Sequence, residues 1–332
     1  MKTIHVGLVA DPASPTKIAY RIRDLKSPSG EDHDGWDIEV VSEPFTTGSE
    51  DIATAVARLG DHAREHEWDL VVGLTELPLR GDDGKYLLFE IDQQRRTAML
   101  SLPAFGGLRM RARTRHAARA LVNDMTDPNS ADERGVPLPR VTDRWRLLLG
   151  MVLANRPWLL VPGLKSALVA ALATGAIATI NSTVWLLAGS LSWWRLTIAT
   201  MASVGLVVAW VVIDGRLWDH PDHDSADARE RSRLYNTSTL VTLTIGVLIC
   251  YFALYVVNLG WALFILDPAV ISGELPENLG YGDLFVLSWF VASAATLGGA
   301  LGAGLESDEA IRAATYSKRE EERRERLARQ RR

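Results

Sequence analysis

The sequence predicts a soluble N-terminal α/β domain joined to an all-α membrane domain of four transmembrane helices. Charged residues fall every few positions up to about Arg146, but from Ser166 to Leu305 they nearly vanish outside one loop. Apolar runs that long exceed what the core of a soluble domain can cover. The chain has 332 residues, which is enough for two domains of ordinary size.

Residues 1–126 alternate between strand and helix patterns, which predicts a cytoplasmic α/β domain. Short apolar runs that end in turn residues predict strands at 3–10, 36–41, 68–74, 86–91 and 97–102. Helices are predicted from residue 15 to Leu25, from the N-cap Ser49 past Leu59, and over 108–125. Because the last two strands form a hairpin, we expect a mixed sheet covered by helices. The expected core includes Val6, Leu8, Val40, Val71, Val72 and Leu100.

Residues 127–165 join the two domains. The stretch 127–143 is rich in proline and polar residues and is predicted to be a linker. The apolar run that follows, 147–154, is too short to cross a bilayer. With Trp145 and its flanking arginines, it suits a helix at the lipid headgroups. An ordinary helix packed under the soluble domain explains the same pattern.

Four apolar segments in residues 166–305 each reach the roughly 20 residues needed to cross hydrocarbon. None has Asp, Glu or Lys in its centre, and tryptophan and tyrosine residues stand near their ends, as is typical of membrane interfaces. The predicted spans are 166–189, 193–213, 239–266 and 284–305.

The distribution of basic residues predicts the orientation. Arginine and lysine gather before the first span, between the second and third, and after the fourth. The turn between the first two spans has only Arg195, and the loop 267–283 has neither Lys nor Arg. Since cytoplasmic loops carry the excess of positive charge, we expect a multi-pass protein of the cell membrane with both termini in the cytoplasm.

Charge and cysteine content restrict the partners. A net charge of −5 gives no electrostatic case for nucleic acid. The basic tail, 306–332, suits a charged cytoplasmic helix that contacts anionic lipid headgroups. The only cysteine, Cys250, excludes an intrachain disulfide and fits a chain that faces a reducing compartment.

Motifs for catalysis or cofactor binding are missing, and no catalytic or cofactor-binding residues are predicted. Neither glycine-rich phosphate loop occurs, and there is no G-x-S-x-G nucleophile elbow. Two histidine pairs have spacings that can hold a metal such as zinc. His62 and His66 stand four apart in DHAREHE, whose other reading is a solvated helix face. His220 and His223 flank Asp222 in a loop whose other reading is a flexible acidic segment.

Small residues recur every fourth position in the first and fourth spans. Such stripes let membrane helices approach closely, either within the bundle or between copies in a homo-oligomer. The stripe in the fourth span consists of Ala294, Gly298 and Gly302, and that in the first of Ala167, Ala171 and Gly175.

The stretches DLVVGLTELPL (69–79) and AMLSLPAF (98–105), followed by an arginine-rich helix with His116, resemble the order of elements in archaemetzincin-type zinc peptidases. In that family, a helix carries H-E-x-x-H, with two histidine ligands and a glutamate base. Here Ala117 replaces the base and Ala120 the second ligand, so the resemblance implies a zincin-like domain without peptidase activity. The whole layout, with LVADPASPTKIA and GALGAGLESDEAIRAA, resembles membrane proteins of high-GC Gram-positive bacteria.

These observations support two functional hypotheses. The preferred one is a membrane-tethered cytoplasmic sensing or interaction domain without catalytic activity. The alternative is a small transporter or channel gated by its soluble domain, for which Asn181 and Asn258 would line a polar path. An enzyme without a recognisable motif is a third, weaker option.

The predicted topology has a direct test. A reporter that is active only in the cytoplasm should work when fused after Arg332 or inserted at Asp222. Inserted at Glu277, in the loop that lacks basic residues, it should be silent. Activity at Glu277 would contradict the four-span arrangement.

Overall fold

The computed structural model describes residues 3–25, 35–46, 52–81, 85–107, 109–126, 133–137, 142–221, 226–266 and 280–303. The contacts divide these residues into two compact units. The sheet unit comprises the described residues up to Asn155 together with those of Pro221–Leu234. The helical unit comprises Arg156–His220 and the described residues from Tyr235 onward.

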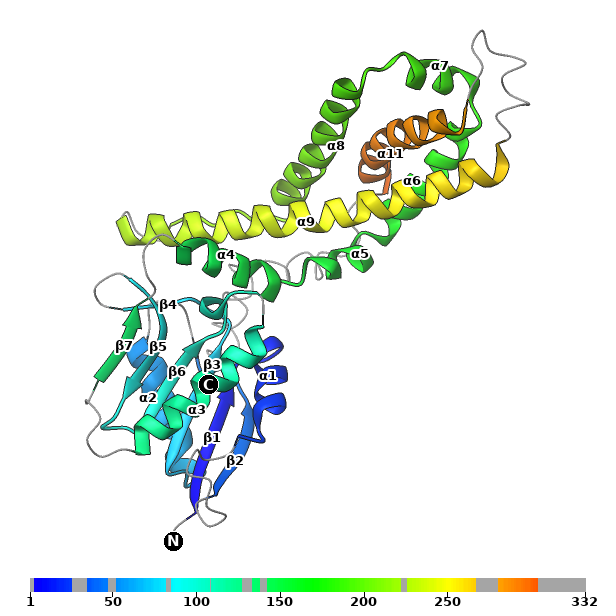
Figure 1. Ribbon diagram of the computed structural model, residues 1–332. Helices are drawn as coiled ribbons and strands as arrows, with labels where there is room; N and C mark the ends of the chain where they lie inside the picture. The colour runs from blue at the N-terminus through cyan, green and yellow to red at the C-terminus, as the bar shows by residue number, and fades with distance from the viewer. Residues whose placement is uncertain are drawn as a thin grey trace. The chain divides into compact units, whose positions relative to one another are not determined.

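The sheet unit is a mixed sheet covered by helices, as the sequence predicts (Figure 1). Its strands are β1 (Ile4–Ala10), β2 (Trp36–Ser42), β3 (Leu70–Thr75), β4 (Leu79–Arg80), β5 (Tyr86–Asp92), β6 (Thr97–Ser101) and β7 (Glu133–Pro137). Its helices are α1 (Ser14–Ile22), α2 (Ile52–Glu65), the short 3-10 helix η1 (Pro103–Phe105), α3 (Met110–Thr126) and α4 (Thr142–Ala154).

The strand order is β2-β1-β3-β6-β5-β4, and β7 also pairs with β5. The first four strands of this order are parallel, and β5 is antiparallel to β6, which confirms the predicted hairpin. Two strands were not predicted. β4 has only two residues, and β7 lies in the proposed linker, where Gly135 and Pro137 hide its strand character. Both pair antiparallel with β5.

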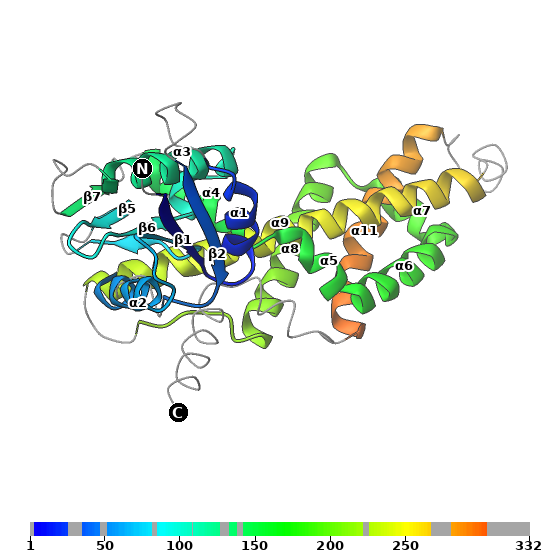
Figure 2. The same cartoon turned by 90° about the horizontal axis from the view of Figure 1, so that it is seen from below.

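Side chains alternate between the two faces of the sheet, because successive residues of a strand point to opposite sides. Val6 and Leu8 of β1 pack with α1 and α3, whereas Val9 packs with α2. Figure 2 shows α2 on one side of the strands and α3 on the other. Both faces are therefore buried, which is the usual state of parallel strands.

Helix α4 packs on the sheet unit. A Cβ atom added at Gly150 would lie 2.1 Å from the carbonyl oxygen of Pro103 in η1, so glycine permits this close approach. Leu148 and Met151 are buried, while Trp145 and Leu149 are exposed. One side of α4 therefore packs on the domain, and the other presents apolar residues.

The helical unit contains three helices long and apolar enough to cross a membrane, or four if one bent pair forms a single span. Among the described residues after Asn155, the helices are the 3-10 helix η2 (Pro157–Leu159), α5 (Leu160–Gly163), α6 (Lys165–Thr179), α7 (Ser182–Ser190), α8 (Trp193–Asp214), α9 (Ala226–Ile265) and α11 (Tyr281–Ala303). Helix α9 contributes its first residues, up to Leu234, to the sheet unit.

The segment predicted as the first span is not one straight helix. It breaks between Thr179 and Ser182, and α6 and α7 meet there at 90°. The Asn181 side chain accepts a hydrogen bond from the backbone N–H of Thr183 and caps α7. The indole N–H of Trp185 donates to the carbonyl of Thr179 at 2.7 Å, which satisfies a carbonyl at the end of α6. Side-chain hydrogen bonds therefore satisfy backbone groups on both sides of the break.

Hydroxyl groups join α8, α9 and α11. The hydroxyl of Tyr251 lies 3.1 Å from that of Thr200 and 2.9 Å from that of Ser293. The indole N–H of Trp289 donates to Thr200 at 2.7 Å, and Ser203 donates to the carbonyl of Ser293. Hydrogen bonds of this kind contribute to helix association in membranes, by roughly 0.6 kcal/mol each on average.

The closest packing of α6 on α11 lies at Gly299. A Cβ atom there would be 2.4 Å from the carbonyl oxygen of Ala167 and 2.6 Å from Cβ of Ala171. At Gly298, the nearest atom would be 3.9 Å away, and Ala294 is exposed. Gly302 lies in α11, in a part whose side-chain surroundings the structure does not describe. The close contact is thus one residue from the predicted stripe, and it uses the stripe of the first span.

Gly299→Ala should lower the melting temperature of the detergent-solubilised protein, because its methyl group would meet the backbone of α6. Overpacking of this kind costs about 1–3 kcal/mol. The adjacent substitution Gly298→Ala is the matched control and should be tolerated, since its nearest neighbour, Cγ2 of Thr174, would lie at an ordinary contact distance of 3.9 Å. Equal melting of the two variants would contradict this packing.

Candidate functional site

The carboxyl ends of β1 and β3 form the edge of the sheet where a ligand site is expected. From β1 the chain turns to β2 through α1, and from β2 it crosses to β3, on the other side of β1, through α2. These helices lie on opposite faces of the sheet. In open α/β sheets, ligands bind at such a switch point, beyond the carboxyl ends of the strands.

A buried carboxylate, Asp11, occupies this edge. Its Oδ2 accepts a hydrogen bond from the hydroxyl of Thr46 at 2.7 Å, and its Oδ1 accepts one from the backbone N–H of Phe45 at 3.2 Å. The Thr46 hydroxyl also lies 3.5 Å from that of Thr75 at the end of β3. Because these groups are fully buried, their hydrogen bonds join the segment after β2 to the ends of β1 and β3.

The neighbouring turn is held in the same way. The Thr75 hydroxyl accepts from the backbone N–H of Leu77, whose carbonyl accepts from the Ser101 hydroxyl at the end of β6. Helix α4 lies against η1, which directly follows this strand. These hydrogen bonds connect the ends of β1, β3 and β6 with the segment after β2, and Asp11 anchors this edge.

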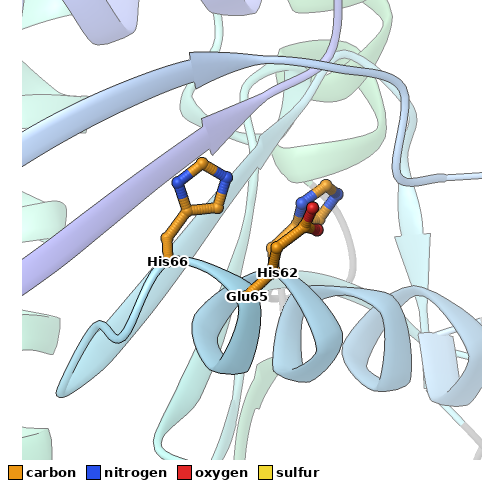
Figure 3. A group of neighbouring side chains, drawn as sticks. All are labelled: His62, Glu65 and His66. Carbon is orange, nitrogen blue, oxygen red and sulfur yellow. The ribbon is translucent and has the colours of Figure 1, made fainter.

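A second group of polar side chains lies near the C-terminal end of α2 (Figure 3). His62, Glu65 and His66 each offer a donor atom, and these atoms all lie within 4.8 Å of one another. The spacing i, i+3, i+4 places the three side chains on one side of a helix. Two imidazoles and a carboxylate form a ligand set that suits a zinc-type ion.

Two glutamates from β2 and the segment after it face these imidazoles. Nε2 of His62 lies 3.7 Å from Oε2 of Glu43, and Nδ1 of His66 lies 3.8 Å from Oε1 of Glu39. The sequence predicts the histidine pair but not the carboxylates of Glu39 and Glu43, because these contacts join residues that are distant in the chain. In the sequence, the one local feature that links Glu39 and Glu43 is their spacing of four residues.

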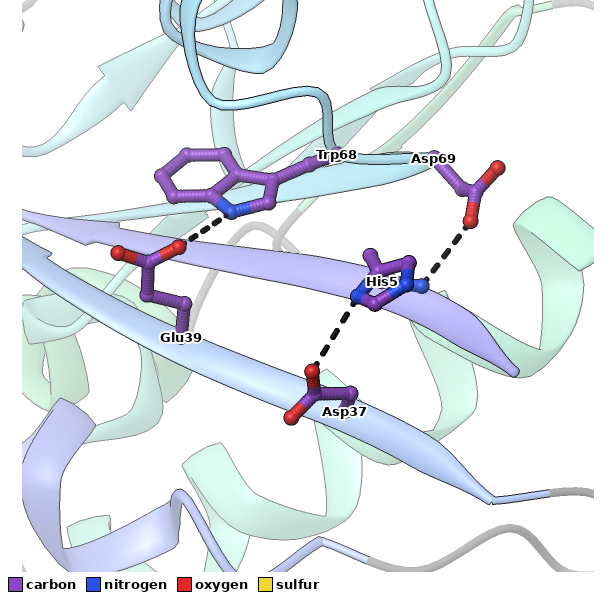
Figure 4. A network of polar contacts seen from close by, with 5 residues as sticks. All are labelled: His5, Asp37, Glu39, Trp68 and Asp69. Carbon is purple, nitrogen blue, oxygen red and sulfur yellow. Dashed lines mark hydrogen bonds and ion pairs between the residues drawn. The ribbon is translucent and has the colours of Figure 1, made fainter.

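Tryptophan at position 68 orients this group. Its indole N–H donates to Oε2 of Glu39 at 2.8 Å, and its ring stacks on the imidazole of His66 with centroids 4.5 Å apart (Figure 4 shows the first contact). A Cβ atom at Gly7 would lie 2.0 Å from this ring, so glycine in β1 leaves the space that the indole fills. Beside it, His5 pairs with Asp37 at 3.2 Å.

The other predicted metal site is only partly described. His220 is exposed at the end of the segment after α8, whereas Asp222 and His223 lie outside the described residues. Next to His220, Asp219 exchanges two hydrogen bonds with the side-chain amide of Asn236, at 2.8 and 2.9 Å. These two hydrogen bonds hold the backbone before α9 against that helix.

The two asparagines proposed for a polar path lie in different surroundings. Asn181 caps α7 and is exposed. Asn258 is buried in α9, and its side-chain oxygen lies 2.5 Å from where Gly175 of α6 would carry a Cβ atom. Asn258 therefore fills space between two helices.

No protein-family model, curated protein or solved structure matches this chain. The candidate sites therefore depend on their own geometry and chemistry.

Asp11→Ala should destabilise the sheet unit, because it leaves the hydroxyl of Thr46 and the N–H of Phe45 without their acceptor. Each buried polar group without a partner costs about 1–3 kcal/mol. Amide hydrogen exchange in β1 and β3 of the full chain should accelerate accordingly. Asp37→Ala, which removes an exposed carboxylate from a neighbouring strand, is the control and should leave this exchange nearly unchanged. Equal protection in both variants would contradict the anchoring role.

Proposed function

We propose that this protein is a membrane-tethered cytoplasmic sensing or interaction protein, without catalytic activity of its own, whose sheet unit acts on the spans through α9. The observation that carries the proposal is the extent of α9. This single helix covers 40 residues, and residues 228–265 within it form a candidate membrane span. At 1.5 Å per residue it is about 60 Å long, roughly twice the thickness of the hydrocarbon layer.

The first turns of α9 are held by ion pairs within the sheet unit. The carboxylate of Glu230 pairs with Arg144, at the start of α4, and lies 3.8 Å from the guanidinium of Arg80 in β4. The Arg80 guanidinium in turn lies over the ring of Tyr86, 5.8 Å from its centroid. A change in β4, β5 or α4 would therefore reach Glu230 directly, and this supports α9 as the connection.

The further elements of the proposal come from sequence. We propose four spans, with α6 and α7 together forming the first, and both termini in the cytoplasm. The basic tail would contact anionic headgroups, and the exposed side of α4, with Trp145 and Leu149, would lie at the same surface. The exposed Ala294 and Gly298 suit contact between copies in a homo-oligomer. The zincin-like resemblance remains a proposal, with α3 as the counterpart of the metal-binding helix.

The transporter or channel alternative has less support. A pocket of about 40 Å³ among α6, α8, α9 and α11 is lined by mostly apolar side chains, including Cys250 and Tyr251. Neither Asn181 nor Asn258 lines it.

The labelling rate of Cys250 tests the connection through α9. This residue is the only cysteine, it is buried in α9, and it lines the pocket just described, so a small maleimide reports the packing of the spans. In lipid nanodiscs, Glu230→Gln should raise the labelling rate by up to about fivefold, the factor equivalent to about 1 kcal/mol for an exposed ion pair.

The matched control is Arg64→Gln, which breaks an exposed pair with Asp61 on α2 and should leave the rate unchanged. Equal rates for wild type, Glu230→Gln and Arg64→Gln would contradict a connection through α9.

A further inference from the structure

We propose that His62, Glu65 and His66 bind a divalent transition-metal ion of the zinc type, and that Glu39 and Glu43 orient the two imidazoles. This site goes beyond the proposed function and does not depend on it. Helix α2 supplies His62 and Glu65, and His66 follows directly after it, while β2 with the segment after it supplies the two orienting carboxylates.

The ligand spacing suits such an ion. Zinc bonds to imidazole nitrogen and carboxylate oxygen at about 2.0–2.2 Å, which separates tetrahedral ligand atoms by about 3.4 Å. The donor atoms of His62, Glu65 and His66 already lie within 4.8 Å of one another. Because Glu65 and His66 are exposed, small rotations of their side chains close the remaining distance.

The carboxylates of Glu39 and Glu43 take the positions of orienting groups. A metal-bound histidine almost always donates its other ring N–H to a carboxylate, a carbonyl or water. Here Nδ1 of His66 faces Glu39, and Nε2 of His62 faces Glu43. This arrangement assigns Nε2 of His66 and Nδ1 of His62 to the metal. The latter atom is shielded from solvent and has no hydrogen-bond partner among the described residues.

The site is supported on one side by packing. His66 stacks on the indole of Trp68, which fills the space at Gly7 and donates to Glu39. The same carboxylate therefore contacts both the indole and the imidazole. Such support restricts His66 to small rotations about this position, which lowers the entropy that metal binding must overcome.

The charges at this place also favour a cation. Three carboxylates, those of Glu39, Glu43 and Glu65, surround two imidazoles. The neighbouring cation, Arg64, is engaged by Asp61. A dication bound to neutral imidazoles would compensate this negative charge.

The test uses the full chain in detergent, stripped of metal with a chelator and titrated with Co²⁺, whose visible absorption reports nitrogen and oxygen ligation, and then with Zn²⁺ as competitor. The wild type should bind one equivalent more than either His62→Gln or His66→Gln. Ions bound elsewhere on the chain contribute equally to the wild type and the variants, so the difference in the number of ions bound reports this site alone.

Glu43→Gln provides the second variant, because it changes an orienting group outside the regular strands and keeps all three ligands. It should weaken binding by about 10–100-fold, as changes in such outer groups do. His5→Gln removes a histidine of the same sheet that pairs with Asp37 and should bind like the wild type. Equal stoichiometry in wild type, His62→Gln and His66→Gln would overturn the proposal.

Discussion

The parallel pairing of β1 with both β2 and β3 is the constraint on which the rest of the sheet unit depends. A strand with parallel neighbours on both sides requires crossover connections, and these place α1 and α2 on opposite faces. The residue after β1 is then Asp11, at the point where the connections diverge. The same pairing puts β2 next to β1 under α2, so that Glu39 meets Trp68 and His66. The position of Asp11 and the contacts of Glu39 with Trp68 and His66 therefore both follow from the place of β1 between β2 and β3.

In the helical unit, close backbone approach and hydroxyl bonds replace the hydrophobic effect as the source of specificity. Lipid is as apolar as leucine, so apolar side chains gain little by leaving it for another helix. Gly299 lets α11 meet the backbone of α6, and the hydroxyls of Thr200, Tyr251 and Ser293 join three helices. The break at Asn181 is likewise supported by side-chain hydrogen bonds at its two ends.

Much of the fold could be predicted from local sequence. Short apolar runs that end in turn residues located β1, β2, β3, β5 and β6, and long apolar segments located α8, α9 and α11. Local patterns failed where distant residues decide the structure. The two-residue β4 and the glycine-containing β7 exist because β5 offers them a partner. Likewise the break between α6 and α7 interrupts a long apolar run, and its local signal is the short polar stretch Asn181, Ser182 and Thr183.

The same limit applies to the sites. Position in a small-residue stripe selected Gly298, but one residue turns a helix by about 100°, and the contact with α6 falls on Gly299. The four-residue spacing of His62 and His66 predicts these two ligands. The contacts of Glu39 and Glu43 with them are found only in the structure, where the β2 segment lies beside the imidazoles. A metal site of this kind combines ligands close together in the chain with carboxylates far from them in the chain. The sequence predicts only the ligands.

The contacts that hold α9 differ in strength along its length. In the helical unit, α9 is held by the half-buried Tyr251 network and by two hydrogen bonds between Asn236 and the backbone of Asp219. Its first turns are held by Glu230, whose side chain is 40% exposed and pairs with arginines. Exposed ion pairs contribute about 0–1 kcal/mol, and coupling between sites in proteins is typically 1–3 kcal/mol. The ion pairs at the start of α9 are therefore weaker than the contacts that hold its later turns.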